Sequence, residues 1–91
     1  MIVEWTRPAI SDLIAIRRYI ALRNPLAAEQ VARRITEAVE RLATFPASGR
    51  PGRKPDAREL IISDTSYLVV YGVRSGIVHI LRVLHTAQRP R

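Results

Sequence analysis

The chain has 91 residues and no cysteine, and its 15 Lys and Arg against 8 Asp and Glu give a formal net charge of +7. This length holds one domain, residues 1–91, while an apolar fraction of 47% argues against disorder and the lack of cysteine excludes disulfides and thiolate metal sites. No apolar run has the length of a signal peptide or a membrane span, so we expect a cytoplasmic protein without membrane contact, whose charge favours polyanionic partners.

The first half of the chain predicts a short strand followed by two helices. Residues 2–5 favour a strand, and Thr6 is a typical N-terminal cap of a helix. Apolar residues then recur at helical spacing, at Ala9, Leu13, Ile16 and Ile20. Asn24 and Pro25 end this helix and begin a second one, which is expected to run to about Thr44. Because the connection is so short, the two helices should form an antiparallel hairpin.

Residues 49–59 read GRPGRKPDARE, and two glycines and two prolines predict a loop rather than a helix. The segment carries four cations: Arg50, Arg53, Lys54 and Arg58. A proline-stiffened backbone loses less entropy on binding, and guanidinium groups bind phosphate or carboxylate at two points. The segment is therefore a candidate anion-binding site, and the alternative is a surface loop that only increases solubility.

After this loop the hydrophobic period changes from 3.6 to 2. Residues 58–63, 67–73 and 77–84 favour strands, and the two short turns between them predict an antiparallel meander. The predicted fold class is α+β, in the order β-α-α-β-β-β, with an N-terminal strand and an antiparallel helical hairpin packed on a mainly antiparallel sheet. We expect the first strand to join this sheet, but the sequence does not indicate which strand it pairs with.

Both faces of the two long strands are apolar, whereas a sheet that is wet on one face should alternate. Val69, Tyr71 and Val73 are expected on one face, and Leu68 and Val70 on the other. One helical hairpin covers a single face, so the second face is predicted to be an apolar surface that binds a partner.

The two histidines, His79 and His85, are six residues apart on one strand, too far to share a metal ion, so no metal site is predicted. His79 is interpreted as a half-buried strand residue. His85 ends the last strand beside Arg82 and the basic tail that contains Arg89, where a general acid could sit. The simpler alternative is that His85 has no chemical role.

Two further charged residues leave alternatives open. Glu59 follows Arg58 on a strand and could act as a base, although a cross-strand ion pair is the simpler interpretation. Arg82 shares strand parity with apolar residues, so its guanidinium needs a carboxylate partner. That partner is either internal, with Glu59 or Glu4 as candidates, or belongs to a bound protein.

The order of strand, two helices, basic loop and meander resembles the RelE/ParE superfamily, the small basic toxins of bacterial type II toxin–antitoxin modules. The resemblance covers nearly the whole chain and lies in six segments: W-T-R-P-A-I-S-D-L (5–13), Y-I-A-L-R-N-P-L-A-A (19–28), F-P-A-S-G-R-P-G-R (45–53), R-E-L (58–60), Y-L-V-V-Y (67–71) and I-L-R-V-L-H (80–85). It implies no cofactor and no small-molecule ligand. It implies instead that a cognate acidic antitoxin binds the chain in a hetero-oligomeric complex. The residues expected to contact the antitoxin are Leu68, Val70, Tyr71 and Arg82.

The resemblance leaves two activities. RelE-type members cut mRNA in the ribosomal A site with a cluster of basic residues and Glu, and usually carry an aromatic residue near the C-terminus. Here the strand position that often carries a catalytic arginine is Leu68, and the tail after His85 has no aromatic residue. These departures favour the ParE type, which is not an enzyme and inhibits DNA gyrase.

A ParE-like toxin would bind its target through a set of cations: Arg50, Arg53, Lys54, Arg82 and Arg89. The alternative is a RelE-like, ribosome-dependent mRNA endoribonuclease, whose catalytic candidates are His85, Arg58, Glu59 and Arg53, with the ribosome and mRNA as partners. A plain nucleic-acid-binding module is a third hypothesis. It is the weakest, because no helix combines a basic face with base-reading polar residues.

Overall fold

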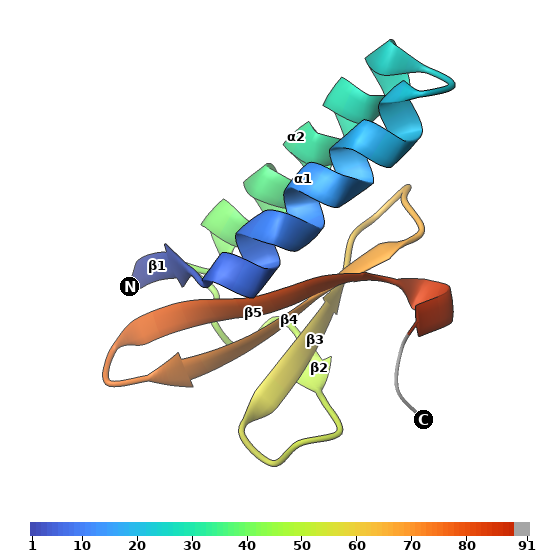
Figure 1. Ribbon diagram of the computed structural model, residues 1–91. Coiled ribbons are helices and arrows are strands. Elements are labelled where there is room, and N and C mark those ends of the chain that lie inside the picture. The colour runs from blue at the N-terminus through green and yellow to red at the C-terminus, as the bar shows by residue number, and fades with distance from the viewer. Residues whose placement is uncertain (89–91) are drawn as a thin grey trace.

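Two antiparallel helices lie across one face of a five-stranded sheet in the computed structural model, which describes residues 1–88 (Figure 1). Helix α1 is Arg7–Ala21 and helix α2 is Pro25–Arg41. Both begin where the sequence predicts, because the Thr6 hydroxyl accepts the Ala9 N–H at 3.3 Å and the Asn24 side chain accepts the Ala27 N–H at 3.0 Å.

The second helix ends three residues earlier than predicted. Helix α2 stops at Arg41, and the chain continues in tight turns in which the Ala43 N–H donates to Glu40 and the Thr44 N–H to Arg41, both at 3.1 Å. The predicted end at Thr44 was wrong because Leu42 is fully buried and prolongs the helical apolar pattern beyond the helix itself.

The strands are β1 (Ile2–Trp5), β2 (Arg50–Pro51), β3 (Ala57–Ile61), β4 (Tyr67–Arg74) and β5 (Ile77–His85), and the short 3₁₀ turn η1 (Thr86–Gln88) follows. Their order in the sheet is β1-β5-β4-β3-β2. Strand β1 runs parallel to β5, and every other pair is antiparallel. The α+β class and the mainly antiparallel sheet are confirmed. The neighbour of the first strand, which the sequence did not indicate, is β5.

The basic segment is a β-hairpin rather than a loop throughout. Strand β2 pairs Arg50 with Glu59 and Pro51 with Arg58, and the Gly52 N–H donates to Ala57 at 2.8 Å. Pro51 is tolerated because β2 is an edge strand, where one backbone N–H can be missing. The prediction of a loop was therefore wrong at its start, where Arg50 and Pro51 form a strand, whereas β3 begins only one residue before the strand predicted from Arg58.

The core lies between the helical hairpin and the sheet. Its buried members are Ala9, Ile35, Ala38, Val39, Leu42, Ile62, Tyr67, Val69, Tyr71, Val78, Ile80 and Val83. Within residues 1–88, no helix combines the length and the apolar character that a membrane crossing requires.

A β-bulge changes which residues of β5 face this core. Val70 pairs with Arg82 while the next residue, Tyr71, pairs with Ile80, so Leu81 is the extra residue. The bulge reverses the alternation, and Ile80 and Val83 both point into the core although they are three residues apart. The predicted parity of Arg82 with Ile80 was wrong for this reason.

Candidate functional site

The base of the basic hairpin is held at Gly49 by two side chains. The Gly49 N–H donates to the Tyr71 hydroxyl at 2.8 Å, and the Gly49 carbonyl accepts from the Arg58 guanidinium at 2.8 Å. Tyr71 is fully buried and also donates to the Pro46 carbonyl at 2.8 Å. A Cβ atom on residue 49 would lie 2.6 Å from the Tyr71 oxygen, so only glycine fits. The hairpin therefore leaves the core in one fixed position.

Glu59 forms a cross-strand ion pair, as the sequence suggested, and the structure shows that its partner is Arg50. Their side chains approach to 3.6 Å between Arg50 Nη2 and Glu59 Oε1, in directly opposed positions of β2 and β3. The Glu59 side chain is only 5% exposed, whereas that of Arg50 is 46% exposed. This pairing gives the carboxylate a structural role, and nearly half of the Arg50 side chain stays exposed.

Arg53 and Lys54 lie at the tip of the hairpin and are exposed. Within residues 1–88 neither belongs to an ion pair. The Arg58 guanidinium, by contrast, donates hydrogen bonds to the carbonyls of Gly49 and Ala47, the latter at 3.4 Å. Of the four cations in the segment, Arg53 and Lys54 are thus the two that point fully outward. Arg89, also proposed from sequence, lies outside the described residues.

His85 is part of the packing at the end of β5. Its ring meets the Tyr67 ring edge-on, with centroids 5.4 Å apart, and its Nδ1 accepts the Ala87 N–H at 3.0 Å. The backbone N–H of His85 donates to the Gln88 side chain, also at 3.0 Å. Nε2 makes no hydrogen bond among the described residues, so one ring nitrogen stays available for proton transfer.

The candidate nuclease residues do not converge. Arg58 pairs with Tyr71 and His85 with Tyr67, so four residues along β4 and two strand spacings separate the Cα atoms of Arg58 and His85 by about 16 Å. Glu59 adjoins Arg58 on the same strand and therefore points to the opposite face of the sheet. Arg58, Glu59 and His85 therefore do not form one compact cluster in this structure, as an acid, a base and a phosphate-binding cation acting on one ribose would.

The partner of Arg82 is Asp12 on α1. Arg82 Nε donates to Asp12 Oδ2 at 2.7 Å and Arg82 Nη2 to Oδ1 at 3.0 Å, and the Val83 N–H also donates to Oδ2, at 2.9 Å. The internal partners expected from sequence, Glu59 and Glu4, were wrong because β1 pairs with β5 only as far as Ile80, and Asp12 of α1 meets Arg82 and the Val83 N–H beyond that point. Asp12 could have been noticed, since it stands three residues after Ala9 on the apolar stripe.

This pairing sets the ionisation of Asp12. Burial of the carboxyl raises its pKa, but the hydrogen bonds from Arg82 and from the Val83 N–H, together with the Arg82 charge, outweigh that effect. The net pKa of Asp12 lies below the ordinary value of 3.8. The same ion pair raises the pKa of Arg82.

Two of the four residues proposed to contact an antitoxin are inaccessible. Leu68 and Tyr71 have no exposed surface, so neither can touch a partner in this conformation. Val70 is half-buried and Arg82 is exposed, and both keep some accessible surface on the sheet. The sheet face away from the helices holds a shallow groove of about 600 Å³ rather than a continuous apolar surface; its lining residues are Thr6, Asp56, Gly72, Val73, Arg74, His79 and Leu81.

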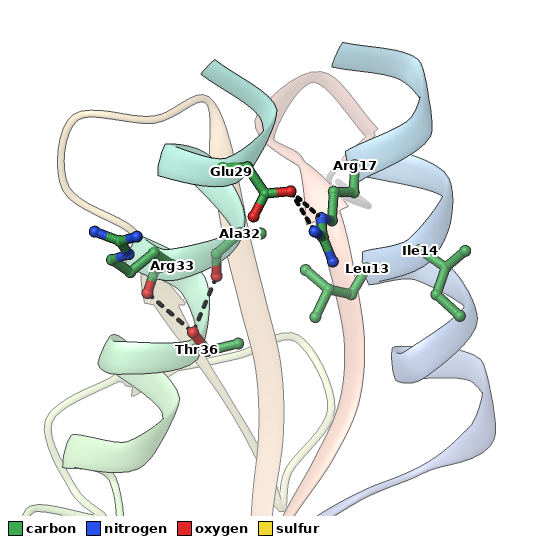
Figure 2. Close-up of a pocket in the computed structure, with 7 residues that line it drawn as sticks. All are labelled: Leu13, Ile14, Arg17, Glu29, Ala32, Arg33 and Thr36. Carbon is green, nitrogen blue, oxygen red and sulfur yellow. Dashed lines mark hydrogen bonds and ion pairs between the residues drawn. The ribbon is translucent and has the colours of Figure 1, made fainter. Parts of the chain in front are cut away.

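The helical hairpin exposes more apolar surface than the sequence indicated. Its large exposed side chains are Ile10, Ile14, Tyr19, Leu22 and Leu26. A hollow of about 340 Å³ lies between the helices, lined by Leu13, Ile14, Arg17, Glu29, Ala32, Arg33 and Thr36. Figure 2 shows Arg17 reaching from α1 to Glu29 on α2, with Nε donating to Oε1 at 3.0 Å. This bridge ties the helices together across the hollow. Ile10 and Ile14 could have been noticed, because they are four residues apart and off the core stripe.

The charged residues among positions 1–88 offer no candidate metal centre. Within residues 1–88, no three His, Asp or Glu side chains come together in a way that could hold a metal ion.

Comparison with known proteins agrees with this fold. The family described as ParE toxin of type II toxin–antitoxin system, parDE, matches residues 3–90. "Putative toxin Y4kP" of Sinorhizobium fredii is 44% identical over 87 residues, which cover 96% of this chain and 90% of that protein. "Toxin RelE2" of Caulobacter vibrioides is 42% identical over 86 residues, which cover 94% of this chain and 96% of that protein.

A solved structure is similar over the same extent. The chain described as "Chromosomal ParDE TA system from P. aeruginosa" superposes with a TM-score of 0.85 at 28% identity, covering 93% of this chain and 95% of that one. The family match, the two relatives and the shared fold all span nearly the full length. This chain therefore belongs to the ParE toxin family, within the RelE/ParE superfamily, and is a toxin of a type II toxin–antitoxin system.

Proposed function

We propose that this toxin arrests growth in the cytoplasm as a ParE-like inhibitor of DNA gyrase, acting by contact and not by cleaving RNA. The observation that carries the proposal is the separation of the nuclease candidates. Arg58 is engaged with loop carbonyls, Glu59 is buried against Arg50, and His85 lies about 16 Å from Arg58 along the sheet. The membership of the ParE family supports the same choice.

The surface that would meet gyrase is the tip of the β2–β3 hairpin. Arg53 and Lys54 project there from a base that Tyr71 and Arg58 hold in place, so binding costs little ordering of the backbone. Two exposed cations on a chain of net charge +7 would speed association with an acidic surface and fix its orientation.

Supercoiling by purified gyrase tests this proposal. The wild-type toxin should inhibit supercoiling, and the double variant Arg53→Glu/Lys54→Glu should need about tenfold more toxin for the same inhibition, because attraction becomes repulsion. The matched control is Arg23→Glu/Arg33→Glu, which changes the net charge equally at exposed positions of the helical hairpin. The control should inhibit nearly as well as the wild type. Supercoiling that is untouched at excess toxin would rule out gyrase as the target.

An mRNA endoribonuclease is the second candidate, since the relative at 42% identity is named "Toxin RelE2" and Nε2 of His85 is available. The variant His85→Phe keeps a ring against Tyr67 but cannot transfer a proton. We expect His85→Phe to arrest growth as strongly as the wild type, without cleaved mRNA in either strain. Loss of arrest in a folded variant, with mRNA cuts in the wild type only, would favour the nuclease instead.

A further inference from the structure

The groove on the sheet face away from the helices brings together charged groups that the rest of the described chain does not use. Both helices lie on the other side of the sheet (Figure 1), and the groove has a volume of about 600 Å³. Asp56, Arg74 and His79 line it. Within residues 1–88, none of these three side chains forms a hydrogen bond or an ion pair. Polar groups without internal partners that converge on one hollow are typical of a ligand site.

Gly72 forms the floor of the groove. It pairs with Ala57 of β3 on one side and with His79 of β5 on the other, so the three residues form a row on one face of the sheet. The Cα atoms of Ala57 and His79 are two strand spacings apart, about 10 Å. Because glycine has no side chain and alanine has only a methyl group, this row leaves a gap beside the His79 ring. A Cβ atom on residue 72 would lie 3.1 Å from the Asp56 carbonyl oxygen, so any side chain there would narrow the gap.

The rim of this gap supplies one acid and one cation. Asp56 directly precedes β3 and is exposed. Arg74 lies two residues after Gly72 on β4, so it belongs to the same face of the sheet, and it is also exposed. His79 is half-buried, as the sequence indicated, and Leu81 adds apolar surface to the lining. A flat ligand in the gap would therefore meet an imidazole, a carboxylate and a guanidinium at once.

These groups match the chemistry of a guanine nucleotide. A carboxylate only accepts hydrogen bonds and can accept two side by side, whereas guanine presents two adjacent donors, N1–H and the 2-amino group. Adenine, cytosine and uracil do not offer two adjacent donors on one edge. An imidazole ring stacks on a base, and a guanidinium binds phosphate.

We propose that this groove binds a guanine nucleotide, with the base over Gly72 beside the His79 ring, its donor edge on the Asp56 carboxylate and its phosphate against Arg74. The sequence indicated no small ligand, and this site goes beyond the proposed action on gyrase. A guanosine within a single strand of RNA carries the same groups as the free nucleotide. The net charge of +7 favours the approach of either one.

Nuclear magnetic resonance of the free toxin, titrated with guanosine monophosphate, tests the site. The backbone amide signals of Gly72, Arg74 and His79 should shift, while those of the helical hairpin stay in place. Inosine monophosphate lacks only the 2-amino group, so it should bind about tenfold more weakly, because one hydrogen bond to a charged group is lost. Guanosine monophosphate that causes no shift, or shifts that are equal with inosine monophosphate and with inorganic phosphate, would overturn the proposal.

Variants of the rim separate recognition of the base from attraction of the phosphate. Asp56→Asn should bind both nucleotides with affinities that agree within about twofold, because asparagine offers only one acceptor to the base. The matched control is Asp64→Asn, an equal charge change in the turn between β3 and β4, which should keep the preference for guanine. Arg74→Gln should weaken both nucleotides by about fivefold and leave the preference unchanged. A preference that survives in Asp56→Asn would refute the assignment of the base.

A short single-stranded RNA with one guanosine distinguishes the two sources of the ligand. An RNA that shifts the same amides, depends on Asp56 in the same way and binds more than about tenfold more tightly than guanosine monophosphate would assign the groove to guanosine in RNA. An affinity equal to that of guanosine monophosphate would assign it to the free nucleotide. Because these measurements contain no gyrase, failure of the gyrase proposal would leave their result unaffected.

Discussion

Replacing Tyr71 with phenylalanine should lower the free energy of unfolding by about 3 kcal/mol, because two hydrogen-bonding groups of one loop lose their partner. The Gly49 N–H and the Pro46 carbonyl both bond to the Tyr71 hydroxyl at 2.8 Å, and the Tyr71 side chain is fully buried. A buried group left without a partner costs roughly 1–3 kcal/mol. For a domain of this size the melting temperature should fall by roughly 15 °C, measured by circular dichroism or calorimetry.

Tyr67→Phe is the matched control. Tyr67 is also a buried tyrosine of β4, but its hydroxyl makes no hydrogen bond within residues 1–88. Removing that hydroxyl should change the stability by less than about 0.5 kcal/mol. If both variants lost the same stability, the loop contacts of Tyr71 would not be the cause.

The same change should also loosen the basic hairpin. Gly49 would remain bonded to Arg58 alone, so Arg53 and Lys54 would be presented from a less ordered base. We therefore expect Tyr71→Phe to weaken the action of the toxin at temperatures where the variant is still folded. This consequence links the core of the domain to the surface that is proposed to meet the target.

The starts of the helices were predictable because they are encoded locally. Thr6 caps the first helix, Asn24 caps the second, and Pro25 stands at the first helical position, so each start follows from neighbouring residues, whereas the end of the second helix did not. The three-strand meander was predictable for a similar reason, because its turns are short and Ser75 and Gly76 both adopt positive φ.

The features that sequence did not reveal depend on distant contacts. Strand β2 exists because Arg50 and Pro51 meet β3, and two residues carry no periodicity of their own. The bulge near Leu81 reverses the alternation without any glycine to mark it, and it places Arg82 on the opposite face of the sheet from Ile80. Asp12 meets Arg82 and Val83 from the distant helix α1, so no local pattern indicated this contact.

The candidate site was predicted in part. The exposure of Arg53 and Lys54 agrees with their proposed role, and a cross-strand ion pair of Glu59 was expected, although its partner Arg50 was not named. The antitoxin surface was placed on Leu68 and Tyr71, which are buried, because alternation alone does not say how deeply a sheet face is covered.

Asp12→Asn should destabilise the fold by about 2 kcal/mol at neutral pH, because a carboxylate there accepts three hydrogen bonds, two of them from a guanidinium. Asparagine keeps the shape and one acceptor but presents an amide donor to Arg82. The half-exposed position of Arg82 keeps the expected loss well below that of a fully buried ion pair.

The lowered pKa of Asp12 determines how the stability loss in Asp12→Asn changes with pH. Because the folded pKa of Asp12 lies below its ordinary value of 3.8, the ion pair adds stability above about pH 4 and loses it as the pH falls through the folded pKa. Urea unfolding of the wild type and of Asp12→Asn should therefore differ most at pH 7 and converge toward pH 2.

Glu29→Gln is the control for this experiment, since it removes the partner of Arg17 from a pair whose side chains are both more than half exposed. An exposed pair of this kind should contribute less than about 0.5 kcal/mol. A gap between the wild type and Asp12→Asn that stays constant from pH 7 to pH 2 would show that the substitution acts through shape and not through the charge of Asp12.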